Sequence, residues 1–207
     1  MPTIQHDLDQ DLIDSANSED SPAVVAFLIA QGADPKAQRS HALLRAAING
    51  HVETVKLLIP LSDPRAGSSS PLRMAAASGR ADCVRLLIPV SNPKDVNSGA
   101  LAWAAANGHA ECAKLLIPVS TPLTQNPQAL NLAIAGGHAQ VASIMLLDDP
   151  PLLESLRASG RLSIHRDAAV GNGHLGLAAL LDSIIDLGEI CSAAGDCKPC
   201  RPRLSRL

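Results

Sequence analysis

The segment ALLRAAINGHVETVKLLIP, residues 42–60, decides the fold of this chain because it recurs at a fixed spacing. It is followed by PLRMAAASGRADCVRLLIP at residues 71–89, ALAWAAANGHAECAKLLIP at residues 100–118 and ALNLAIAGGHAQVASIMLL at residues 129–147. The glycines of these segments are 29 residues apart, at Gly50, Gly79, Gly108 and Gly137. A fixed period of this length is typical of a stacked repeat array, in which each unit contacts only its neighbours.

Each unit predicts a helix, a tight turn, a second helix and an extended connector. The first helix is expected to end at the repeated glycine, which adopts positive φ without penalty. The second helix runs into Leu-Leu-Ile-Pro in three units, and proline cannot continue a helix. Capping hydroxyl or amide side chains are expected where the first helices begin, near Ser40, Ser69, Ser98 and Asn126.

The composition also predicts helices. Hydrophobic residues make up 46% of the chain, but aromatic residues only 1%, namely Phe27 and Trp103. The core must therefore consist of alanine and unbranched aliphatic side chains, which are strong helix formers. The predicted fold class is an all-α solenoid of helix-turn-helix units.

We expect a single domain over residues 1–188. It comprises a degenerate first unit at residues 8–40, the regular units at 41–147 and an irregular capping unit at 150–188, after the break Asp148-Asp149-Pro150-Pro151. Residues 189–207 form a basic, cysteine-containing tail that is expected to be flexible.

Charge and targeting signals restrict the function. The net charge of −3 and the pI of about 6.1 argue against a nucleic-acid partner. The chain has no apolar run of membrane length and no signal peptide at its acidic N-terminus. Five cysteines, an odd number, do not suggest a secreted disulfide scaffold. We therefore expect a cytoplasmic monomer that binds neither membrane nor cofactor, with export by another route left open.

Several segments resemble ankyrin repeats. The stretch Ser70–Arg80, SPLRMAAASGR, resembles the ankyrin signature TPLHxAAxxGH. Gly32-Ala33-Asp34-Pro35 resembles the turn between ankyrin repeats, and Ala102-Trp103-Ala104-Ala105 resembles their frequent HWAA. The resemblance covers about residues 8–147.

The chain departs from the ankyrin pattern in two ways. Its period is 29 residues where ankyrin repeats use about 33, so the projecting β-hairpin fingers are expected to be shortened or absent. The Thr and His of the signature are missing from every unit, so we expect fewer side-chain hydrogen bonds between adjacent turns.

The resemblance implies that the concave side of the array binds a protein. Its contacting positions are the two residues before each helix-ending glycine, to which we add the nearby Arg73 and Trp103 because arginine and tryptophan dominate interface energies. The predicted partner-binding residues are Ile48, Asn49, Arg73, Ala77, Ser78, Trp103, Ala106, Asn107, Ala135 and Gly136.

No motif for catalysis stands out, and we predict that the protein is not an enzyme. The histidines after the repeated glycines lie one unit apart, too far to share a metal ion, so a role in the turn is expected. Cys83 and Cys112 are expected to be buried apolar residues. The tail cysteines Cys191, Cys197 and Cys200 supply only three of the four ligands of a structural zinc site.

The leading hypothesis is a non-catalytic adaptor that binds a partner protein. One alternative is an effector delivered into a host cell, suggested by the basic segment Arg201–Arg206. The other is a redox- or metal-dependent switch that uses the tail cysteines, since basic neighbours lower the pKa of a thiol.

Overall fold

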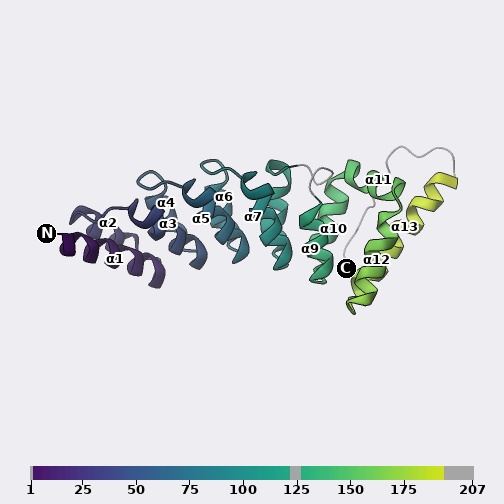
Figure 1. Cartoon of the computed structure of the whole chain (residues 1–207), viewed down its shortest axis with the longest axis horizontal. Helices are drawn as coiled ribbons and strands as arrows, with labels where there is room; N and C mark the ends of the chain where they lie inside the picture. Colours follow the sequence, from purple (N-terminus) through teal and green to yellow (C-terminus); the bar gives the residue numbers. More distant parts are fainter. Residues whose placement is uncertain (1, 122–126, 194–207) are drawn as a thin grey trace.

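A computed structural model of the chain describes residues 2–121 and 127–193. All regular elements in this part are helices, and its connectors contain no strand. Figure 1 shows the helices side by side in an elongated array with the N-terminus at one end. The predicted all-α solenoid is confirmed, and the described connectors have no β-hairpin finger.

Within the described residues, six helical hairpins follow one another. The first helices are α1 (Pro2–Ser18), α3 (Ala37–Asn49), α5 (Ala66–Ala77), α7 (Asp95–Ala106), α9 (Gln128–Ala135) and α12 (Arg161–Gly171). The second helices are α2 (Pro22–Ala30), α4 (Val52–Leu58), α6 (Ala81–Leu87), α8 (Ala110–Leu116), α10 (Ala139–Asp148) and α13 (Leu175–Ala193). A 3₁₀ turn, η1 (Ile117–Val119), follows α8, and α11 (Pro150–Ala158) joins α10 to α12. First helices pack on first helices and second on second, which gives two layers.

The core between the layers repeats with the sequence. The leucine near the start of each regular first helix is enclosed, at Leu43, Leu72, Leu101 and Leu130. Burying one such side chain contributes about 1.5–3 kcal/mol. The alanines one turn later are also fully buried, at Ala46, Ala75, Ala104 and Ala133. Their small side chains let neighbouring first helices approach closely, as the composition predicted.

An unusual left-handed turn lies within the first residues of α3, α5 and α7, so the regular part of each helix begins after the turn. Its members have φ between 49° and 61° and are Gln38, Arg39 and Ser40, then Gly67, Ser68 and Ser69, then Val96, Asn97 and Ser98. This conformation costs residues other than glycine roughly 1–2 kcal/mol each. It persists only where surrounding contacts hold it in place.

The serines that end these turns provide such contacts. The Oγ atoms of Ser40, Ser69 and Ser98 accept hydrogen bonds from the backbone N–H groups of Asp63, Asn92 and Thr121 in the next connector, at 2.8, 3.0 and 2.8 Å. Asn126, the fourth predicted cap, lies outside the described residues. The sequence predicts that the three serines cap their own helices, but their hydroxyls are bonded to the next connector. The left-handed backbone directs each hydroxyl to the following unit instead.

A second row of serines also joins the connectors. The hydroxyls of Ser62 and Ser91 donate to the carbonyls of Pro35 and Pro64, at 3.2 and 3.3 Å. The equivalent Ser120 is buried, and its hydroxyl has no hydrogen-bond partner among the described residues. The absence of the Thr and His of the ankyrin signature predicts fewer side-chain hydrogen bonds between adjacent turns, yet such bonds are present at three successive junctions. Serines provide them.

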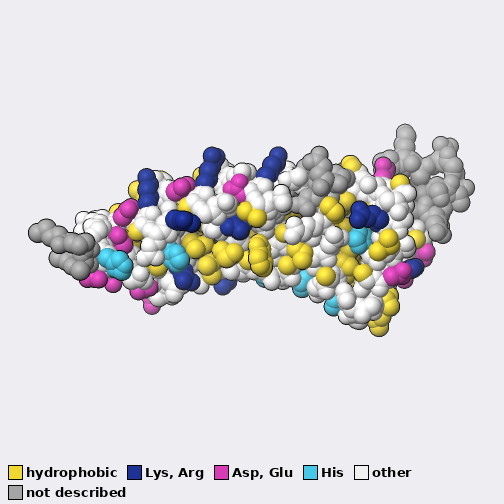
Figure 2. Space-filling model, in the orientation of Figure 1, with side chains coloured by type: hydrophobic (Ala, Val, Ile, Leu, Met, Phe, Trp, Pro, Cys, Tyr) yellow, Lys and Arg dark blue, Asp and Glu magenta, His cyan; other side chains and the backbone are white. Residues whose placement is uncertain are grey.

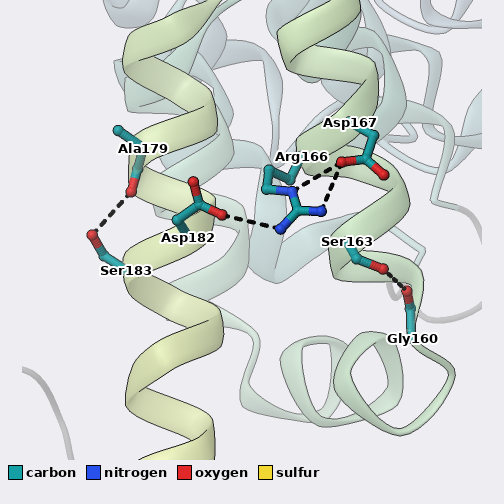
Figure 3. Close-up of polar contacts among 7 residues, drawn as sticks. All are labelled: Gly160, Ser163, Arg166, Asp167, Ala179, Asp182 and Ser183. Atoms are coloured by element: carbon teal, nitrogen blue, oxygen red, sulfur yellow. Dashed lines mark hydrogen bonds and ion pairs between the residues drawn. The ribbon is translucent and has the colours of Figure 1, made fainter.

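The last hairpin, α12–α13, packs on α9 and α10. Arg166 on α12 bridges the two helices of this hairpin, with one nitrogen 2.8 Å from Asp167 Oδ1 and another 3.4 Å from Asp182 Oδ1 (Figure 3). Helix α13 runs to Ala193 and so includes the start of the predicted tail. The remaining tail lies outside the described residues. None of the described helices is both long and apolar enough to cross a membrane.

Candidate partner-binding surface

The exposed side of α3, α5, α7 and α9, called here the first-helix face, carries the most prominent apolar surface of the regular units. Trp103 is 48% exposed on α7, and Val96 is 58% exposed in the left-handed turn at the start of this helix. Figure 2 shows hydrophobic side chains gathered in a band over the region of α5 and α7, with Lys and Arg side chains above it. An exposed tryptophan in such a band is a typical anchor for a partner.

Trp103 borders a pocket of about 440 Å³ between α7 and α9. Its lining consists of Val96, Asn97, Gly99, Ala102, Trp103, Ala106, Gln128 and Leu132. Trp103 and Leu132 occupy the same repeat position, one unit apart, so they face the same way from neighbouring first helices. Pockets of this size and apolar character are typical binding sites.

Arg73 extends from α5 toward the edge of this pocket. A Cβ atom on Gly99, which lines the pocket, would lie 3.2 Å from Arg73 Cδ. The guanidinium of Arg73 donates from Nε to the Ser68 carbonyl at 3.0 Å. It also donates from Nη2 to the Gly67 carbonyl at 2.9 Å. The arginine therefore supports the left-handed turn while lying beside the apolar site.

The ends of the first helices form a second structural feature, a ladder of hydrogen bonds between units. The residue after each repeated glycine, and His174 after Gly173 in the last hairpin, reaches back to a carbonyl near the end of the preceding first helix. The pairs are His51 with Ala16, Arg80 with Ile48, His109 with Ala77, His138 with Ala106 and His174 with Ala135, at 2.8–3.0 Å. The histidine nitrogens must carry the proton because a carbonyl only accepts.

The same ladder gives the repeated glycines a second role. All four have positive φ, as predicted. In addition, a Cβ atom on Gly79 would lie only 2.6 Å from the ring of His109. Glycine is thus required both by its backbone conformation and by the side chain of the next unit. The predicted role of the histidines in the turn now has a geometric basis.

The ladder changes the interpretation of several predicted contact residues. Ile48, Ala77, Ala106 and Ala135 use their carbonyls to bind the next unit. Asn49 Nδ2 donates to the Asn17 carbonyl at 2.6 Å, and Asn107 Nδ2 donates to the Ala77 carbonyl at 3.0 Å. These side chains border the face while also joining units. Ser78 and Gly136 directly follow α5 and α9.

The pocket brings together only Trp103 and Ala106 from the predicted set. Sequence reasoning missed the other lining residues, which are Val96, Asn97, Gly99, Ala102, Gln128 and Leu132. One signal for Leu132 was available in the sequence, because it lies one period after Trp103 and therefore on the same side of its helix.

Charge is distributed unequally between the two layers. The left-handed turns and regular first helices contain Arg39, Arg45 and Arg73, and their one acidic residue is Asp95, which opens α7. The second helices instead carry adjacent opposite charges, such as Glu53 with Lys56 at 2.6 Å and Asp82 with Arg85 at 3.3 Å. The first-helix face is therefore apolar and cationic.

The cysteines and histidines provide no metal site among the residues that the structure describes. Cys83 and Cys112 are buried, and burial raises the pKa of each thiol to about 11, with the charges of Asp82 and Glu111 acting in the same direction. Cys191 belongs to α13, whereas Cys197, Cys200 and Arg201–Arg206 lie outside the described residues.

Comparisons with known proteins agree with this architecture. A family model described as ankyrin repeats, three copies long, matches residues 12–99 and also residues 75–154. Ankyrin repeats are in general protein–protein interaction modules. No curated protein matches the chain.

Proposed function

The chain belongs to the ankyrin-repeat family, and from this membership we propose that it is a non-catalytic adaptor that binds a partner protein on its first-helix face. The observation that carries the proposal is the half-exposed Trp103 beside the pocket between α7 and α9. A tryptophan so placed supplies apolar contact area to a partner without having to be exposed by a conformational change.

The pocket also explains why binding is expected to centre on the third and fourth regular units. Ala102 and Ala106 are small, so a partner atom approaches the backbone of α7 closely there. Trp103 and Leu132 provide the larger walls. Such a site excludes water from a few central contacts, which is where interface energy concentrates.

Affinity capture with matched variants tests the proposal. Asn107 follows Ala106 at the rim of the pocket and is exposed, so Asn107→Arg places a long side chain there that blocks close approach of a partner to the backbone of α7. His109 Nε2 also donates to the Ala77 carbonyl, at 3.0 Å, so loss of the Asn107 hydrogen bond leaves no unpaired acceptor. We expect the substitution to cost no more than about 1 kcal/mol of stability.

The control is Glu111→Lys, an exposed site on α8 in the other layer. Captured partners should bind Asn107→Arg at least about tenfold more weakly, which corresponds to roughly 1.4 kcal/mol. Glu111→Lys should bind them like the parent chain. If Glu111→Lys abolished capture and Asn107→Arg did not, the binding surface would be the second-helix layer and the proposal would be wrong.

A further inference from the structure

The guanidinium of Arg73 is a fixed positive charge at the edge of an apolar pocket. In addition to the two carbonyls of the left-handed turn, it donates from Nη2 to Ser70 Oγ at 3.1 Å. All three acceptors are neutral, and no carboxylate in the described part of the chain forms an ion pair with Arg73. Three hydrogen bonds orient the group, so binding an anion there costs little conformational entropy.

The surroundings of Arg73 lack the negative charge that would otherwise neutralise it. The left-handed turns and regular first helices have three arginines and a single carboxylate, that of Asp95. The nearby Asp95 lies in the first turn of α7, and its two oxygens accept from Ser69 Oγ at 2.7 Å and from Asn92 Nδ2 at 2.5 Å. The carboxylate of Asp95 therefore serves hydrogen bonds that join neighbouring connectors.

Arg45 adds a second cation on the same face, and its guanidinium is hydrogen-bonded to His41. Arg45 Nε donates to His41 Nε2 at 3.0 Å, so this ring nitrogen must be unprotonated. Burial, together with the Arg45 charge, lowers the pKa of His41. The pair consequently carries the single charge of Arg45 at neutral pH.

We propose, on the basis of the proposed function, that the partner presents an acidic segment with one large apolar side chain. The apolar side chain occupies the pocket beside Trp103, and carboxylates that flank it lie against Arg73 and Arg45. Nε and Nη2 of Arg73 are engaged in the turn, so its Nη1 and the charge of the guanidinium remain for a carboxylate of the partner. Complementary charge also selects the partner and speeds its association.

Selection from a displayed random-peptide library tests the partner chemistry. The intact protein should enrich peptides with net negative charge and at least one Leu, Ile, Phe or Trp. Leu132→Glu, which places a negative charge inside the apolar pocket, should abolish this enrichment, whereas Lys114→Glu on the opposite layer should leave it unchanged. Basic or neutral peptides that still required the pocket would overturn the charge assignment but retain the proposed function. Enrichment that persists in Leu132→Glu, or no enrichment, would overturn both.

The enriched acidic peptide is then titrated with Trp103 fluorescence as the signal, since Trp103 is the only tryptophan in the chain. Binding should shift the emission to shorter wavelength and should weaken as salt is raised. Arg73→Gln should weaken binding by at least about tenfold, whereas Arg85→Gln, which removes a cation paired on the second-helix layer, should have no effect. Insensitivity to salt in the parent chain would refute the ionic contribution even if Arg73→Gln did not fold.

Discussion

Replacing Ser69 with alanine tests the account of how neighbouring units are joined. Ser69 is fully buried, and its hydroxyl serves two groups of the next connector. It accepts from the Asn92 N–H and donates to the Asp95 carboxylate. Ser69→Ala removes both contacts without changing the size of a core side chain.

The expected loss follows from these two hydrogen bonds. A neutral hydrogen bond contributes about 0.5–1.5 kcal/mol and one to a charged group about 1.5–3 kcal/mol. Asp95 is only partly buried, so water recovers some of the second contribution. We expect Ser69→Ala to lower the free energy of unfolding by about 2–3 kcal/mol.

The chain contains its own controls at Ser40 and Ser98. Each of these serines is buried and accepts one backbone hydrogen bond from the next connector, and neither has a recorded contact with a carboxylate. Ser40→Ala and Ser98→Ala should therefore cost about 1 kcal/mol each. Urea unfolding is followed by helical circular dichroism and by Trp103 fluorescence, because coincident transitions are needed to compare free energies in a repeat protein.

A different ranking would refute this reasoning. If these serines merely capped their own helices, all three substitutions would cost about the same, near 1 kcal/mol. Equal losses of stability at the three positions would therefore remove the evidence that these serines join neighbouring connectors.

Three further outcomes are expected. Ala104→Glu places a charge at a fully buried site between first helices and should lower the free energy of unfolding by more than about 3 kcal/mol. Hydrogen exchange should show the loss of order in neighbouring units. Melting like that of the parent would show that the assigned register is wrong. Burial raises the pKa of Asp20, but hydrogen bonds from Thr54 and Glu53 outweigh it and lower the pKa below 3.8. Its stabilising effect is thus present above that pH and lost in acid, so on acidification the parent should lose slightly more stability than Asp20→Asn, by less than about 1 kcal/mol. Thiols with a pKa of about 11 should resist alkylation at neutral pH in the folded protein, so rapid labelling of Cys83 or Cys112 by iodoacetamide would contradict their burial.

The repeat pattern was sufficient to predict the two-layer helical array. Glycine and proline mark the ends of the helices through backbone restrictions that act locally, and these restrictions held at Gly50, Gly79, Gly108 and Gly137. The enclosed leucines and alanines followed from helical spacing. The partition into one domain over residues 1–188 stays a prediction, because the way in which the units unfold together has to be measured.

The left-handed turns could not be predicted, because their first two positions share no residue type and the serine at the third does not favour positive φ. Gln38, Gly67 and Val96 occupy the same position, and only glycine favours this conformation. The turn depends on contacts from the next unit, which a local pattern does not contain. The pocket beside Trp103 was missed for a related reason, since its walls come from two units.

The ladder of hydrogen bonds between units has a consequence for how such a gene can change in length. Each unit carries a donor for the unit before it and exposes a carbonyl for the unit after it, as His109 and Ala106 illustrate. An in-frame duplication or deletion of one whole unit therefore restores every junction without any compensating substitution. An insertion or deletion whose length is not a whole number of units separates a donor from its acceptor. Unequal recombination is thus tolerated in steps of one period, and the protein can gain or lose binding surface by whole units while its existing surface remains intact.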